Sequence, residues 1–159
     1  FIDALLEVFP DACIVQTHRD PVRVLVSISS LVATLRSLGS NKVDLQEIAR
    51  LYADWLARGF NHTVALRKAG RLPPEQVIDI QFSDFIQHQI GCVRQAYQHF
   101  GWQLSPQAGI SMQHFLDNHP ADKHGRHLYS FADIGMDLEQ LRELFRPYQE
   151  YFGIETEPL

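Results

Sequence analysis

The chain has 159 residues, of which 45% are hydrophobic and 21% charged, and its formal net charge is −5. This composition is typical of one globular domain and excludes disordered, collagen-like and highly charged tail classes. The apolar runs are too short to span a bilayer, and the first residues lack the basic start and apolar core of a secretory signal. Two cysteines, Cys13 and Cys92, are too few for a disulfide framework, which favours a reducing, cytoplasmic compartment.

The charges are distributed unevenly along the chain. Residues 1–80 contain nine Lys/Arg and nine Asp/Glu, whereas residues 81–159 contain five and ten. A chain with net negative charge is a poor general nucleic-acid binder, so we expect no nucleic-acid partner. Eleven of the fourteen cations are arginine, the residue that binds phosphate and carboxylate through a planar fork. A small anionic ligand held by a few local arginines is compatible with this pattern.

Local patterns in the first half of the chain predict two long helices between two strands. Apolar spacing predicts that a helix ends near residue 9, and residues 12–17 have the length and composition of a buried strand. Asp20-Pro21 is a strong helix start, with Asp as N-cap and Pro at the first helical position. This helix runs to about Leu38, and a second runs from the N-cap Asp44 to Gly70.

The second half of the chain predicts one more strand followed by helices. Residues 77–82 form the strand, and Ser83-Asp84 opens one helix that continues to Gly101. A short helix follows from Ser105-Pro106 to about residue 116, residues 117–135 have no clear period and are predicted as loop, and Asp137 caps a last helix.

This order of elements predicts an α/β fold with a parallel sheet, because parallel strands need helical crossovers. Two strands are few for such a sheet, which is normally buried on both faces. The chain also begins with Phe1 rather than Met and enters an apolar helical pattern at once. We therefore expect residues 1–159 to be a single partial domain whose other strands precede residue 1.

The sharpest candidate for a functional site is Arg19, where a strand ends and a capped helix begins. Ligands of open α/β sheets bind at the carboxyl ends of the strands, and an arginine there can hold a phosphate or sulfate. Ser27 follows eight residues later, about two helical turns along, and its hydroxyl could donate to the same group. An alternative is equally open from local chemistry alone: Arg19 pairs with Asp20 or another carboxylate, and Ser27 is incidental.

The sequence around these residues resembles the sulfotransferase family. The resemblance lies in Phe9-Pro10-Asp11-Ala12 leading through Ile14-Val15 into Thr17-His18-Arg19-Asp20-Pro21, and then Ser27. It extends to the second strand and its following helix, which ends in Tyr97-Gln98-His99-Phe100-Gly101, and to His127–Ser130, Ile134–Met136, Tyr148 and Phe152 of the bacterial-type C-terminal portion.

The resemblance implies a P-loop NTPase-like three-layer α/β/α sandwich that transfers a sulfuryl group from PAPS (3′-phosphoadenosine 5′-phosphosulfate) to a hydroxyl or amine. Arg19 and Ser27 would hold the 3′-phosphate, Phe82 would replace the family's tyrosine and pack near the adenine, and Lys123 and Arg126 would stand in for a basic loop. The acceptor would be a small molecule or glycan, and no metal is expected. The glycine-rich phosphosulfate loop and the catalytic base would lie upstream of residue 1, so we expect the isolated chain to be inactive and to fold poorly.

Other interpretations remain open at this point. Lys123-His124-Gly125-Arg126-His127 can be a solvated polar loop, and it weakly resembles the Arg-His-Gly motif of histidine phosphatases. Metal binding by Asp117, His119, Asp122, His124 and His127 lacks the usual spacing of zinc sites. For the whole chain, the alternatives are a non-catalytic helical interaction module and another P-loop enzyme such as a small-molecule kinase.

Overall fold

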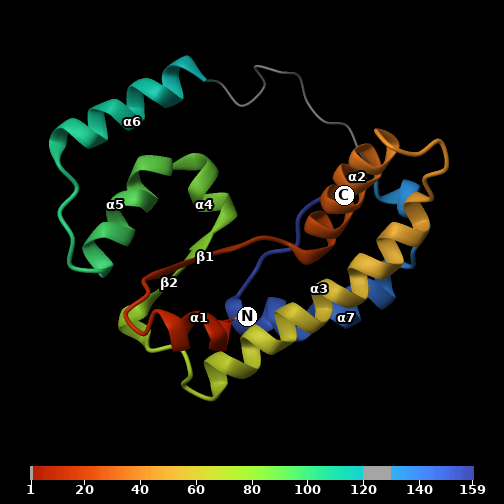
Figure 1. The fold of residues 1–159 in the computed structure, drawn as a ribbon, viewed down its shortest axis with the longest axis horizontal. Helices are drawn as coiled ribbons and strands as arrows, with labels where there is room; N and C mark the ends of the chain where they lie inside the picture. Colours follow the sequence, from red (N-terminus) through yellow and green to blue (C-terminus); the bar gives the residue numbers. More distant parts are fainter. Residues whose placement is uncertain (1, 120–129) are drawn as a thin grey trace. The chain divides into compact units, whose positions relative to one another are not determined.

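The computed structural model describes residues 2–119 and 130–159. The described residues divide into two compact units, the first made of residues 2–18 and 70–119 and the second of residues 19–69 and 130–159 (Figure 1). The elements in chain order are α1 (Ile2–Val8), β1 (Ile14–His18), α2 (Pro21–Ser37), α3 (Leu45–Lys68), η1 (Pro74–Gln76), β2 (Val77–Gln81), α4 (Phe82–Gln87), α5 (Gln89–His99), α6 (Pro106–Asn118), η2 (Phe131–Ile134) and α7 (Leu138–Phe152).

The first unit contains a parallel sheet whose strands come from distant parts of the sequence. β1 pairs with β2 in a register that runs from Ile14 opposite Val77 to His18 opposite Gln81. One face of β2 packs on α5, where Ile78 and Ile80 form a cluster with Cys92, Ala96 and Phe100. The predicted α/β class with a parallel sheet is therefore confirmed, and within the described residues the sheet has two strands.

The edges of two predicted elements differ from the structure. The strand predicted at residues 12–17 is present, but it runs from Ile14 to His18. Val15 within it is 48% exposed, so the expectation that the strand is buried is wrong. Phe82 was expected in the second strand but is the first residue of α4. The apolar composition of both stretches predicts their type, but it does not say where hydrogen-bonded pairing stops.

The single helix predicted from Ser83 to Gly101 is also wrong, because the structure has two helices there. His88 has a non-helical backbone (φ −140°, ψ 52°), which ends α4 and precedes α5. The hydrogen-bond ladder resumes at once, since the Cys92 N–H donates to the His88 carbonyl at 2.9 Å. The apolar spacing continues across the break, so the sequence pattern gave no sign of it.

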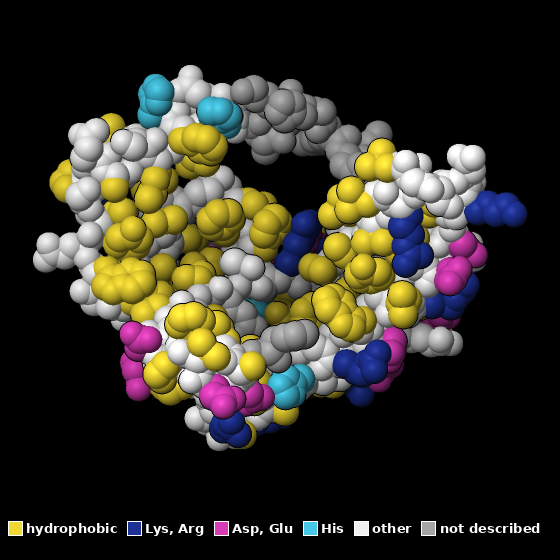
Figure 2. All heavy atoms as spheres, in the orientation of Figure 1, with side chains coloured by type: hydrophobic (Ala, Val, Ile, Leu, Met, Phe, Trp, Pro, Cys, Tyr) yellow, Lys and Arg dark blue, Asp and Glu magenta, His cyan; other side chains and the backbone are white. Residues whose placement is uncertain are grey.

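An apolar groove lies between the helices of the first unit. Its volume is about 470 Å³, and its lining consists mostly of apolar side chains from α4, α5 and α6: Phe85, Gln89, Ile90, Val93, Ser111, Met112, Phe115 and Leu116. Figure 2 shows the apolar side chains of this unit gathered over these helices, on the left of the view.

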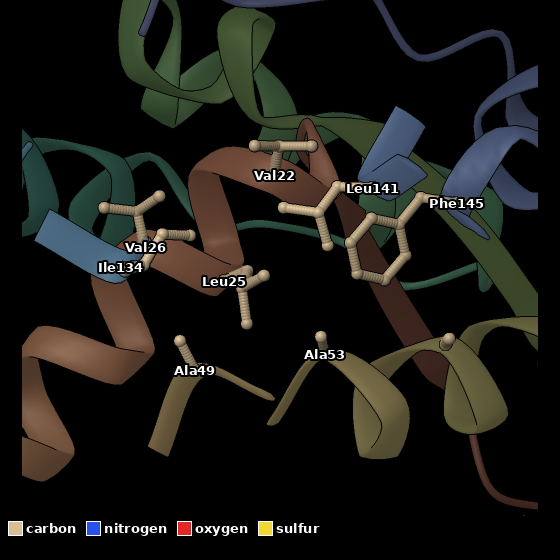
Figure 3. Packing of buried hydrophobic residues seen from close by; sticks show 9 residues of the cluster. Val22, Leu25, Val26, Ala49, Ala53, Ile134, Leu141 and Phe145 are labelled. Atoms are coloured by element: carbon tan, nitrogen blue, oxygen red, sulfur yellow. The ribbon is translucent and has the colours of Figure 1, made fainter. Parts of the chain in front are cut away.

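The second unit is a helical layer around one apolar core. Val22, Leu25 and Val26 of α2 meet Ala49 and Ala53 of α3, and side chains of η2 and α7 complete the cluster (Figure 3). Phe145 of α7 is fully buried in it. A second cluster continues along α3 and α7, where the Phe60 ring stacks on Tyr148 with centroids 4.2 Å apart.

Side-chain caps fix where the long helices of this unit begin. The carboxylates of Asp20, Asp44 and Asp137 accept hydrogen bonds from Val22, Glu47 and Gln140 N–H, respectively. The predicted starts of all three helices are therefore confirmed. Of the helices that the structure describes, none combines the length and the apolar character that crossing a membrane requires.

Candidate anion-binding site

Asp20 is the structural centre of the candidate site, at the N-terminus of α2 in the second unit. Its side chain is fully buried and accepts three hydrogen bonds. Oδ1 accepts from Val22 N–H at 2.9 Å and from Arg142 Nη1 at 2.6 Å, and Oδ2 accepts from the backbone N–H of Glu157 at 2.9 Å. One carboxylate thus joins α2, α7 and the C-terminal segment. Because both of its oxygens are used in this way, Asp20 is a scaffold residue and not a ligand.

Arg19 lies just before this cap and pairs with the side chain of Glu157. Arg19 Nε donates to Glu157 Oε1 at 2.9 Å, and Arg19 Nη2 donates to Oε2 at 2.8 Å. These two nearly parallel hydrogen bonds are the fork geometry in which arginine binds carboxylate and phosphate alike. The alternative of an ion pair with a carboxylate other than Asp20 is therefore present in the structure, and any anionic ligand of Arg19 must share or replace this partner.

A second arginine reaches the same carboxylate. Arg23 Nε lies 3.9 Å from Glu157 Oε2, so Arg19 and Arg23 converge on one acidic group. Ser27 lies one further turn along α2 and is half-buried. Since residues four apart lie above one another on a helix face, Arg23 is placed between the positions of Arg19 and Ser27.

His18 ends β1 in the first unit and is fully buried. Its Nε2 lies 2.8 Å from Asp79 Oδ1 of the neighbouring strand. A histidine beside Arg19 could contact a ligand or close the end of the strand. The pair with Asp79 joins the end of β1 to the middle of β2, which supports the structural role.

The other predicted site residues lie in other parts of the chain than the start of α2. Phe82 is half-buried at the start of α4 in the first unit, and its contact with an adenine stays a prediction. Lys123 and Arg126 lie outside the described residues.

The alternative metal site falls largely outside the described residues as well. Asp122, His124 and His127 lie there, whereas His119 Nδ1 contacts the Phe115 carbonyl at 2.9 Å, and Asp117 accepts a hydrogen bond from Gln113. Within residues 2–119 and 130–159, no three acidic, histidine or cysteine side chains are grouped as metal ligands would be.

Sequence reasoning missed two members of the site, Glu157 and Arg142. Glu157 is 138 residues from Arg19, and Arg142 is 122 residues from Asp20. Both lie among other charged residues of the last helix and tail, where nothing in the local pattern distinguishes them. The one pointer in the sequence was the alternative that Arg19 pairs with a carboxylate other than Asp20, which did not say where that carboxylate lies.

Comparisons with known proteins decide the family. A model of the sulfotransferase family matches residues 1–106, which include β1, the start of α2 and β2. The chain belongs to the sulfotransferase family. No curated protein sequence matches it significantly. This membership confirms the resemblance and favours a transferase over a non-catalytic helical module or a small-molecule kinase.

Solved structures of bacterial sulfotransferases share the fold of this chain. Sulfotransferase STF9 from Mycobacterium avium superposes with a TM-score of 0.84 at 28% identity over 99% of the chain. Sulfotransferase STF1 from Mycobacterium tuberculosis H37Rv superposes with a TM-score of 0.69 at 29% identity over 91%. The chain spans 40% and 36% of the lengths of these two relatives. The activity of a whole sulfotransferase is therefore a proposal for the present chain.

Proposed function

We propose that this chain forms the 3′-phosphate-binding part of a sulfotransferase that uses PAPS as donor and a hydroxyl or amine of a small molecule or glycan as acceptor. Arg19 and Ser27 are the phosphate ligands in this proposal. Sulfuryl transfer, like phosphoryl transfer, depends mainly on positioning and charge stabilisation. Anchoring the nucleotide end of the donor would place its sulfonate for attack by the acceptor.

The observation that carries this proposal is the fork of Arg19 at the N-terminus of α2. Its Nε and Nη2 hold the two oxygens of a carboxylate in the arrangement that a phosphate would adopt. The N-terminus of a helix adds partial positive charge and favours anions. The side chain of Arg19 is 26% exposed, so a ligand can reach it from solvent.

Nucleotide binding tests the proposal directly on the 159-residue chain. Isothermal titration with PAP, the 3′,5′-bisphosphate product of PAPS, should give a tighter complex than adenosine 5′-monophosphate, which has no 3′-phosphate. The variant Arg19→Ala should weaken PAP binding by about 1.5–3 kcal/mol, the range for hydrogen bonds to charged groups, and Ser27→Ala by about 1 kcal/mol. Arg36→Ala is the matched control, because Arg36 is exposed in the last turn of the same helix.

The two nucleotides distinguish a contact of Arg19 with the 3′-phosphate from a contact with the 5′-phosphate. The proposal is wrong if Arg19→Ala leaves PAP affinity unchanged, or if it weakens PAP and adenosine 5′-monophosphate equally. Because the chain spans at most 40% of the length of its structural relatives, we expect binding without turnover from these residues alone.

A further inference from the structure

The most informative feature beyond the proposed function is the way Glu157 is held. Its carboxylate lies 2.8 Å from Arg19 Nη2 and 3.9 Å from Arg23 Nε, and the same oxygen, Oε2, faces both arginines. Its backbone N–H donates to Asp20, which fixes the C-terminal segment at the start of α2. An acidic side chain from a distant part of the sequence therefore occupies the position of an anionic ligand.

Two arginines share the carboxylate of Glu157. The two arginines carry two positive charges and face one carboxylate, while the third arginine of the cluster, Arg142, is neutralised by Asp20 at 2.6 Å. The helix N-terminus adds further positive potential. A phosphate monoester carries about −1.5 to −2 charge near neutral pH and has three acceptor oxygens, so it matches two arginines better than a carboxylate does.

The spacing on α2 places Arg23 where such a phosphate would lie. Arg23 is four residues after Arg19 and four residues before Ser27. Four residues of α-helix rise by about 6 Å, so an anion that contacts both Arg19 and Ser27 passes over Arg23. The side chains of Arg19, Arg23 and Glu157 are 26%, 24% and 33% exposed, and a ligand can therefore enter from solvent.

We propose that Arg23 is a second arginine ligand of the 3′-phosphate and that the Glu157 carboxylate is an internal competitor that the phosphate displaces. This inference rests on the proposed function, because it concerns the same site. Arg19 and Arg23 form the anion site, and Glu157 fills it when no nucleotide is bound. A bound dianion and the Glu157 carboxylate repel each other at this distance, so only one of them is held by the arginines at a time.

This arrangement predicts that one substitution at Glu157 lowers the stability of the unliganded chain and raises its affinity for PAP. Glu157→Gln keeps the size of the side chain but removes the charge that pairs with Arg19 and Arg23. The unliganded variant loses an ion pair and is therefore slightly less stable in urea. Its PAP affinity nevertheless rises about three- to tenfold, because Arg19 and Arg23 no longer have to give up the Glu157 carboxylate before they bind the phosphate. A residue with a purely structural role would lower both quantities.

The experiment measures PAP affinity by isothermal titration on the 159-residue chain and on five variants at one ionic strength, beside the Arg19→Ala variant of the binding test above. Glu155→Gln is the control for Glu157→Gln, because Glu155 is exposed and lies two residues away in the same segment. Arg23→Ala should weaken PAP binding about tenfold, and Arg23→Lys should recover part of the loss, since lysine keeps the charge but not the fork. Arg36→Ala, on the same helix, should change the affinity by less than about twofold.

Each result separates this inference from the proposed function. Tighter binding by Glu157→Gln and weaker binding by Arg23→Ala support it. Weaker binding by Glu157→Gln would mean that the carboxylate orients Arg19 for the ligand, and equal gains in Glu155→Gln would mean a general charge effect; either overturns the competitor role. If Arg19→Ala impairs binding but Arg23→Ala does not, the proposed function stands and the second ligand is wrong. If PAP binds neither to the unchanged chain nor to any variant although each unfolds cooperatively in urea, the proposed function itself fails.

Discussion

Replacing Asp20 with alanine should destabilise the second unit far more than removing an ordinary helix cap. The carboxylate is fully buried and accepts hydrogen bonds from Val22, Arg142 and Glu157. Loss of an N-cap costs about 1 kcal/mol. Arg142 would also lose its partner, and because its side chain is 22% exposed we take about 2 kcal/mol, below the 3–5 kcal/mol of a fully buried pair. The expected loss is therefore about 3 kcal/mol.

A matched control isolates the contribution of the ion pair. Asp44 caps α3 in the same unit through one hydrogen bond of 3.0 Å to Glu47 N–H, and it is exposed. Asp44→Ala should therefore cost only the cap, about 1 kcal/mol. Urea unfolding can be followed by the fluorescence of Trp55 in α3, after Trp102→Phe removes the tryptophan of the other unit.

The comparison between these two substitutions tests the interpretation of Asp20. An Asp20→Ala variant that loses no more stability than Asp44→Ala would refute it, because the contacts to Arg142 and Glu157 would then contribute nothing measurable. Asp20→Asn should lie between the two, since asparagine is a good N-cap but carries no charge for Arg142.

Three further predictions compare buried with exposed side chains or concern a buried thiol. Iodoacetamide at pH 8 should modify the exposed Cys13 and spare the buried Cys92 until urea is added. Burial first, and then the charge of Asp84, raise the pKa of the Cys92 thiol, so the folded state binds this proton more tightly than the unfolded state. The stabilisation that comes from this proton is therefore fully present at low pH and is lost as the pH rises above about 8.5. The free energy of unfolding of a Cys92→Ala variant should fall less steeply in this range. Equal slopes for the two proteins would contradict this interpretation. Phe145→Ala, at a fully buried position, should cost about 3–5 kcal/mol of unfolding free energy, whereas Leu144→Ala, at a 39% exposed position on the same helix, should cost under about 1 kcal/mol; similar losses would place Phe145 outside the core.

Local chemistry accounts for most of the elements that the sequence predicted. Caps such as Asp20, Asp44 and Asp137 are recognisable because a short acidic side chain satisfies backbone N–H groups two or three residues away. The helices α2, α3 and α7 follow from these caps and from apolar residues at helical spacing. The break at His88 was missed because it interrupts hydrogen bonding without interrupting that spacing.

The residues of the candidate site were likewise predicted only in part. Arg19 and Ser27 were found because a strand end, a capped helix start and a spacing of eight residues lie within one stretch of sequence. Arg23 was not singled out, since nothing local shows which acidic residue it meets. The contacts of Phe82, Lys123 and Arg126 with a nucleotide remain predictions.

Sequence alone thus established the helix starts, the α/β class and the arginine at the end of β1, because each depends on interactions between near neighbours in the chain. The register of β1 on β2, the burial of Asp20 and the convergence of Arg19 and Arg23 on Glu157 were decided by the folded chain. Charged partners separated by more than a hundred residues meet only after the helices between them have packed, and any of several acidic residues would satisfy the local sequence equally well. The choice of Glu157 is a consequence of that packing, through the Glu157 N–H that binds Asp20.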